Sequence, residues 1–222
     1  KADDSQRINE IEGIWRAALN ADATCIVTQQ RNGAVALWSA ELGTRLPGDL
    51  SAAKTISGIV AAADSNHVLL QIEEGKFQAH ELRSGMAVSP VLEVAGKEAK
   101  GFFSPDGSTV WIRSADGSVR VFETRSGTKR MEVQLPANND DTELDLEVRF
   151  CQRGAMALLL DAKGRLHRYD TRKWEEKMPF LAHPNAEAYF LSFSASDDGL
   201  RAATFDSPGE NGPNGTLQIG RA

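Results

Sequence analysis

The stretch DGSVRVFETRSG, residues 116–127, lies between two glycine turns and has the alternation of a β-strand. Val119 and Val121 alternate with Ser118 and Arg120, and Phe122 ends the run. A period of two places one set of side chains on each face of a sheet. The stretch therefore predicts a strand, and the fold depends on whether it recurs.

Matching stretches recur at a fixed step along the chain. Two sets of glycines and one set of aspartates each keep a spacing of 42 residues: Gly33, Gly75 and Gly117; Gly43, Gly85 and Gly127; Asp22, Asp64 and Asp106. Two further copies follow after insertions, with Gly164 lying 47 residues beyond Gly117 and Gly215 lying 51 beyond Gly164. The chain therefore holds five copies of one unit.

Each unit is predicted to contain four short strands. The second and fourth residues after the first glycine fit an alternating strand in every copy except at Arg168. A strand is also expected before each copy, at 24–28, 67–71, 109–113, 155–160 and 200–205, with a further apolar segment on either side. Asn-Gly and Asp-Gly pairs, as at 116–117, supply the positive φ that tight hairpins need. The predicted fold class is all-β.

Four strands repeating at about 40 to 45 residues are typical of a propeller blade. The predicted blades are 13–50, 55–94, 97–135, 142–182, and 186–222 completed by 6–12. A four-stranded sheet buries one face poorly when it stands alone, so neighbouring blades must stack.

Residues 103–133, FSPDGSTVWIRSADGSVRVFETRSGTKRMEV, resemble a WD-repeat blade. The place of the name-giving Trp-Asp pair is held by Trp38-Ser39, His80-Glu81, Phe122-Glu123, Tyr169-Asp170 and Gly220-Arg221. No blade has the Gly-His pair that often opens the repeat, so the resemblance does not carry over the family's buried His and Asp network. Segments such as GTRLPGDL resemble divergent bacterial WD repeats attached to signalling kinases and other multidomain regulators.

The two ends of the chain are predicted to meet in the last blade. The third strand of that blade stops near Ile219, and residues 6–12, QRINEIE, supply a fourth strand. A closed ring of five blades and five blades of a larger ring both fit this pattern. The chain begins at Lys1, which suggests a domain trimmed from a longer protein.

Composition favours a globular protein and argues against several classes of partner. The net charge of −6 disfavours a surface that binds nucleic acid by counterion release. Cys25 and Cys151 are too few for a disulfide framework or a zinc site, so both are predicted to be buried thiols. Apolar runs are far shorter than the roughly 18 residues that span a bilayer. We expect no membrane insertion and a cytoplasmic location.

The sequence shows no catalytic motif, and we expect neither an enzyme nor a cofactor. Nucleophile elbows, zinc-protease motifs and phosphate loops are missing, and we expect no metal site. The four histidines, His67, His80, His167 and His183, fall at unrelated blade positions and are predicted to be structural or solvated. KGRLHRYDTRKW, residues 163–174, mixes basic and aromatic residues but is interpreted as an ordinary outer strand.

Two insertions are the predicted binding region. NNDDTELDLE, residues 138–147, enters the fourth blade, and a polar loop runs from Asp206 to Asn214. The WD-repeat resemblance implies that both loops lie on one rim, where loops vary freely on a rigid scaffold. The residues predicted to bind a partner are Asp140, Asp141, Glu143, Asp145, Ser207, Glu210, Asn211 and Asn214.

Three classes of function fit these features. The first is a non-enzymatic scaffold or sensor that binds a protein or peptide, which the acidic insertion suggests is basic. The second is a propeller that binds a small ligand or metal in its channel, although residues expected there, such as Gly58, Ile59 and Gly101, are small or apolar. The third is an incomplete ring that assembles with another chain.

Overall fold

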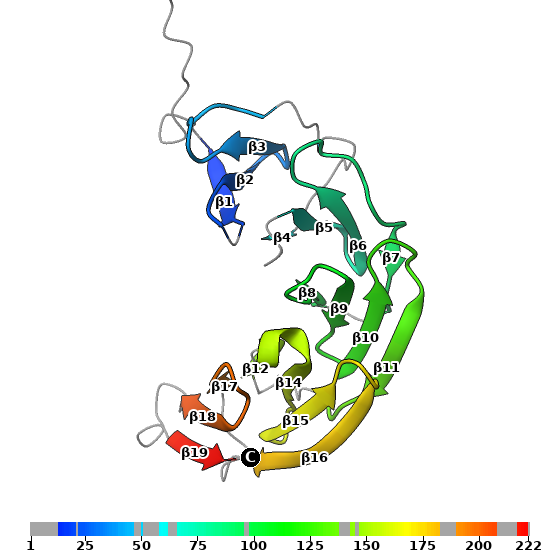
Figure 1. The fold of residues 1–222 in the computed structure, drawn as a ribbon, viewed down its shortest axis with the longest axis vertical. Coiled ribbons are helices and arrows are strands. Elements are labelled where there is room, and N and C mark those ends of the chain that lie inside the picture. The colour runs from blue at the N-terminus through cyan, green and yellow to red at the C-terminus, as the bar shows by residue number, and fades with distance from the viewer. Residues whose placement is uncertain are drawn as a thin grey trace, which may run out of the picture. The chain divides into compact units, whose positions relative to one another are not determined.

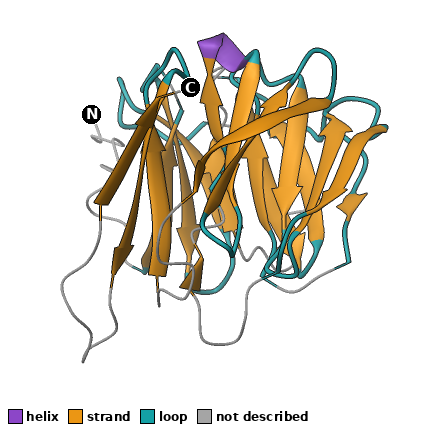
Figure 2. Ribbon diagram, turned by 90° about the horizontal axis from the view of Figure 1, so that it is seen from below, coloured by secondary structure: helices purple, strands orange, loops and turns teal. Residues whose placement is uncertain are grey.

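The computed structural model describes residues 13–20, 22–46, 50, 58–61, 66–95, 98–137, 143–144, 147–182, 190–207 and 217–221. These residues form five β-sheets, here called sheets one to five in chain order. The all-β prediction is confirmed for this part of the chain. In the part of the chain that the structure describes, Figure 2 shows strands together with the short 3₁₀ turn η2 (Gln152–Gly154).

The sheets follow one another along the chain (Figure 1). Sheet one contains β1 (Ile14–Leu19), β2 (Cys25–Gln30) and β3 (Val35–Ser39), and sheet two contains β4 (Gly58–Ala61), β5 (His67–Glu73), β6 (Lys76–Glu81) and β7 (Leu92–Glu93). Sheet three contains β8 (Lys100–Phe103), β9 (Thr109–Arg113), β10 (Ser118–Glu123) and β11 (Lys129–Gln134). The predicted strands at 24–28, 67–71 and 109–113 are therefore β2, β5 and β9.

Sheets four and five continue the pattern with one exception. Sheet four contains β13 (Arg149–Cys151), β14 (Met156–Leu160), β15 (Arg165–Asp170) and β16 (Glu175–Ala182). Sheet five has the order β12 (Glu143–Leu144), β17 (Phe190–Ala195), β18 (Arg201–Ser207) and β19 (Leu217–Arg221). β12, which the repeat assigns to the fourth unit, pairs in parallel with β17 of sheet five. Residues 6–12, the predicted fourth strand, lie outside the described residues.

The two glycine series occupy equivalent turns. Gly33, Gly75, Gly117 and Gly164 have φ of 70° to 86° at the tip of the hairpin between the second and third strands. After the third strand, the N–H groups of Gly43, Gly85 and Gly127 donate to carbonyls four residues earlier at 2.8–2.9 Å. Trp174 takes this place in sheet four, with φ of 57° and the same hydrogen bond to Asp170. The repeat is therefore one of backbone geometry as well as spacing.

A second turn recurs between the first and second strands. In sheet three the Ser104 hydroxyl accepts from the Thr109 N–H at 3.0 Å, and the Ser104 N–H donates back to the Thr109 carbonyl. Asp106 accepts from the Ser108 N–H and from the Ser104 hydroxyl. Equivalent bonds are made by Asn20 and Asp22 in sheet one and by Ser196 and Asp198 in sheet five.

The chain divides into two compact units, each with its own core. The first comprises Lys1–Ala95, Gly101–Val110 and Phe122–Thr128, and the second comprises Gly96–Lys100, Trp111–Val121 and Lys129–Ala222. A cluster in the first unit joins Val27 and Leu37 of sheet one to Val68 and Leu70 of sheet two. A cluster in the second unit joins Leu158 and Leu166 of sheet four to Phe193 and Ala202 of sheet five.

Candidate functional site

The described part of the predicted binding region lies at one end of sheet five. Glu143 of β12 pairs with Phe190 of β17, and Ser207 of β18 pairs with the same residue from the other side. The backbone therefore brings together two predicted site residues that are 64 positions apart in the sequence. Asp140, Asp141, Asp145, Glu210, Asn211 and Asn214 lie outside the described residues.

The acidic insertion contributes a strand, which the sequence did not predict. Glu143 and Leu144 lie side by side with Phe190 and Leu191 at the start of β17. Both the insertion and the connection after β18 therefore leave from the end of sheet five at which β17 begins. This arrangement attaches both segments to one hydrogen-bonded sheet.

A buried charged network in sheet four was missed by the sequence analysis. Asp161 follows β14 and is fully buried, and its carboxylate lies 2.9 Å from Nε2 of His167 on β15. The other ring nitrogen, Nδ1, lies 2.6 Å from the carboxylate of Glu176 on β16. A histidine with both nitrogens facing carboxylates donates from both as an imidazolium.

The network shifts the pKa values of His167 and Asp161. Burial by itself disfavours the charged imidazole, but hydrogen bonds to Asp161 and Glu176 outweigh it and raise the pKa of His167 above 6.5. For Asp161, burial is again opposed, by the His167 hydrogen bond and by the N–H groups of Arg165 and Lys163, so its pKa is lowered. His167 was predicted to be structural or solvated, and in the structure it is 8% exposed with both ring nitrogens close to carboxylates.

Arg113 is the last residue of β9, and its side chain extends to sheet four. Arg113 and sheet four both lie in the second unit. Arg113 is 1% exposed, and its guanidinium donates to the carbonyls of Glu147, at 3.2 Å, and Leu160. Tyr169 on β15 is also buried, and burial raises the pKa of its hydroxyl. That hydroxyl has no hydrogen-bond partner among the described residues.

The residues in the Trp place of the repeat are buried in sheets one to four, at Trp38, His80, Phe122 and Tyr169. Trp38 donates from Nε1 to the Thr28 hydroxyl at 2.8 Å, and His80 contacts the Gly85 carbonyl through Nδ1 at 2.9 Å. The residue after each acts on the following turn, as when Glu123 accepts from the Ser126 hydroxyl. These positions link the sheet to its turn.

The described residues bring together no group of three or more His, Cys, Asp or Glu side chains that could hold a metal ion. Cys25 and Cys151 are buried free thiols, as predicted, and burial raises the pKa of both. His67 packs against the ring of Phe103 at 6.1 Å. His183 lies outside the described residues.

Sequence comparisons supply no relative that would assign these features. Within the described residues, no helix is long and apolar enough to cross a membrane. No protein-family model matches the chain, and no curated protein matches it.

Proposed function

We propose that this chain is a non-catalytic β-propeller of the WD-repeat kind that presents loops to a protein or peptide partner. The five repeated sheets, antiparallel except where β12 joins sheet five, are compatible with a propeller. The resemblance rests on the 42-residue period and on the Trp, Phe or Tyr that precedes the turn in three of the units, at Trp38, Phe122 and Tyr169. Attachment to a signalling protein is part of the same proposal.

One observation carries the proposed binding region. The acidic insertion and the connection after β18 flank the same residue, Phe190, at one end of sheet five. Loops held by a rigid sheet lose little conformational entropy when a partner binds. The partner surface therefore combines residues 138–147 with residues 206–214.

The charge of the insertion suggests the chemistry of the partner. Residues 138–147 carry five acidic side chains and no basic one. Such a surface attracts a basic peptide, and the attraction weakens as salt screens it.

To test this, basic peptides that bind the 222-residue chain are first selected from a library. Their affinity is then measured for the wild type and for two variants with fewer acidic residues. The variant D140N/D141N/E143Q/D145N should lose about tenfold or more in peptide affinity at low salt. The matched control E73Q/E74Q/E81Q/E93Q removes the same number of charges from sheet two and should keep that affinity. Equal loss in both variants would mean that overall charge, rather than this region, binds the peptide.

A further inference from the structure

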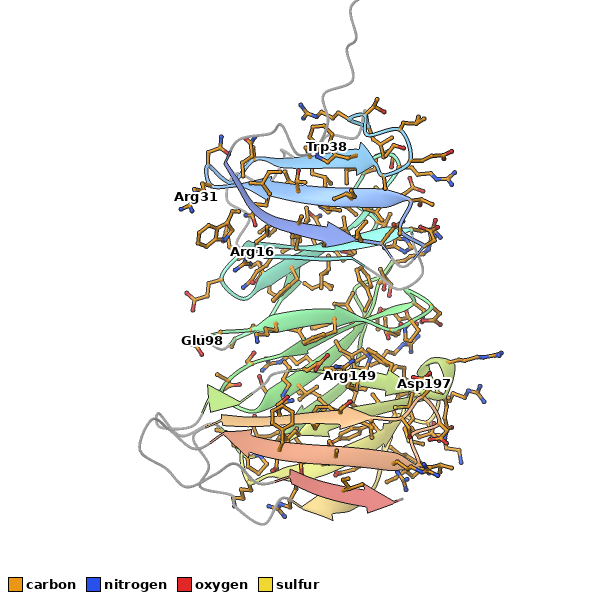
Figure 3. The ribbon with its side chains drawn as sticks, turned by 90° about the vertical axis from the view of Figure 1, so that its left-hand side faces the viewer. Arg16, Arg31, Trp38, Glu98, Arg149 and Asp197 are labelled. Carbon is orange, nitrogen blue, oxygen red and sulfur yellow. The ribbon has the colours of Figure 1, made fainter. Side chains whose placement is uncertain are left out.

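Each of sheets one to four has a face toward the next sheet along the chain, here called its forward face, and an opposite backward face. The equivalent faces of sheet five are given the same names. In sheet one, Val27 and Leu37 on the forward face share a core cluster with Val68 and Leu70 of sheet two. Arg16 of β1 also lies on this side, since its guanidinium is close to Gly58 of β4. Figure 3 shows Arg16 on that side of sheet one and Trp38 on the other.

Forward-face residues pack onto the first strand of the following sheet. A Cβ built on Gly101 of β8 would lie 2.4 Å from Cδ2 of Leu69, so a side chain there would clash with sheet two. Trp111 of sheet three contacts Phe150 of β13 edge-on, with ring centroids 5.6 Å apart. Leu158 of sheet four shares a core cluster with Phe193 of β17. One packing contact thus recurs from sheet to sheet.

The forward face of sheet five breaks this series. Ile219 is the fourth residue after the hairpin glycine, the place held by Leu37, Ala79 and Val121 in sheets one to three. Those three residues are completely buried, whereas Ile219 is 71% exposed. Phe205, on the same face of β18, is 41% exposed. Ile219 is apolar like its counterparts in sheets one to three, but it is exposed where they are buried.

The backward face of sheet one is the matching surface. Ala17 and Leu19 stand three and one residues before the turn residue Asn20, as Gly101 and Phe103 stand before Ser104. Phe103 is 6% exposed and packs against His67 of sheet two, whereas Leu19 is 57% exposed and Ala17 is also exposed. Sheet one therefore presents the kind of strand that forward faces contact elsewhere in the chain.

We propose that the forward face of sheet five binds the backward face of sheet one of a second copy of this chain. The contact continues the established series of sheet interfaces. Ala203 is the counterpart of Leu69, because Ala203 pairs with Ile219 as Leu69 pairs with Ala79. Ala203 therefore contacts Ala17 of the second copy, since Ala17 is the counterpart of Gly101. The proposed contact joins two alanines, whereas the equivalent contact within the chain joins Leu69 and Gly101. None of these residues belongs to the segments of the proposed function, residues 138–147 and 206–214.

A head-to-tail contact of this kind uses two different surfaces, so each can be disabled by itself. The mass of the 222-residue chain in solution should rise with concentration. Ile219→Glu, on sheet five, and Ala17→Glu, on sheet one, should each abolish that rise, because a charge cannot be buried unpaired. Leu42→Glu is the matched control: Leu42 is 69% exposed after β3, outside both faces, and its variant should associate like the wild type.

Mixing the two disabled variants gives the sharpest outcome. The Ala17→Glu chain keeps an intact sheet five, and the Ile219→Glu chain keeps an intact sheet one. An equimolar mixture should therefore form a heterodimer that grows no further. A mixture that stays monomeric while the wild type associates would overturn the head-to-tail assignment.

Cross-linking shows whether the forward face of sheet five binds a second copy of the chain or something else. In the double variant Ala17→Cys/Ala203→Cys, a short thiol-reactive cross-linker should join two chains. A link formed within one chain would overturn the proposal, and so would a wild-type mass that stays monomeric at every concentration. Peptide binding by the acidic insertion is measured on the same variants and should be unchanged, so the two proposals fail separately.

Discussion

Gly43, Gly85 and Gly127 adopt φ of 65° to 71°, and Trp174 adopts φ of 57° at the same place in sheet four. Residues with a Cβ are uncommon in this region because the side chain crowds the backbone. Trp174 is retained there with its ring 6.4 Å from that of Trp111, which is completely buried. Aromatic packing thus accompanies the unfavourable backbone conformation.

Two glycines with similar φ should respond differently to alanine. Gly117→Ala brings a Cβ to 2.1 Å from the Leu135 carbonyl oxygen at φ of 84°, and we expect a loss of about 3 kcal/mol or more in unfolding free energy. Gly43→Ala meets nothing within 4 Å and should lose about 1 kcal/mol from conformational strain. Urea titration of both variants checks this, and equal losses would show that the close approach at Gly117 is unimportant.

His167 should give stability that depends on pH. Its folded-state pKa is raised above 6.5, so its contribution is fully present below pH 6.5 and is lost as pH rises through the folded-state pKa. His167→Gln should therefore lower the melting temperature more at about pH 6 than at about pH 9. Thermal melts at the two pH values provide the measurement.

His80 supplies a control of opposite sign. Burial lowers its pKa more than the Gly85 carbonyl raises it, so wild-type stability falls as pH drops below 6.5 through the folded-state pKa. His80→Gln removes that fall, and its destabilising effect should be smaller at low pH. The same pH trend in both variants would contradict the assigned charge states.

For single residues, the 42-residue period predicted the glycine turns but not the network of Asp161, His167 and Glu176. Glycine positions follow from spacing because each turn needs positive φ. Asp161, His167 and Glu176 meet across two hairpins, and alternation along β15 gives no sign of which carboxylates face the ring. A hydrogen bond between strands depends on register, which is set in three dimensions.

At the level of the element, the described residues on the two faces of sheet five differ in exposure. Phe193 of β17 is 2% exposed within the core of the second unit, and Phe205 of β18 is 41% exposed on the opposite face. The two phenylalanines therefore share a sheet but differ in packing.

Phe193→Ala should cost about 3–5 kcal/mol of unfolding free energy, because it leaves a cavity beside Leu158. Phe205→Ala should cost about 1 kcal/mol or less when measured at low protein concentration. Chemical denaturation of the two variants distinguishes the faces. Similar losses would mean that the forward face is covered even in the isolated chain.

Strand boundaries were predicted well where alternation is strong and poorly at β12. Its two residues, Glu143 and Leu144, pair in parallel with a strand more than 40 positions away. A two-residue strand carries no periodicity, and its acidic neighbours are typical of a loop. The spacing of the repeat assigned residues 143–144 to the fourth unit, whereas their pairing with β17 places them in sheet five.

For the whole molecule, the proposed association predicts a melting temperature that depends on concentration. A partner that binds the folded chain stabilises it by mass action, so the wild-type midpoint should rise as the chain is concentrated. Ile219→Glu should remove the rise, whereas Leu42→Glu should keep it. A wild-type midpoint independent of concentration would count against association of folded chains.

The sequence by itself determined the all-β class, the strands that alternate and the turns that recur every 42 residues. These features are local, because strand periodicity and turn geometry are set by neighbouring residues. Tertiary structure decided the pairing of β12 with β17, the carboxylates around His167 and the exposure of Ile219, whose counterparts in sheets one to three are buried. Each of these depends on residues distant in the chain, and burial of a face depends on the sheet that packs against it.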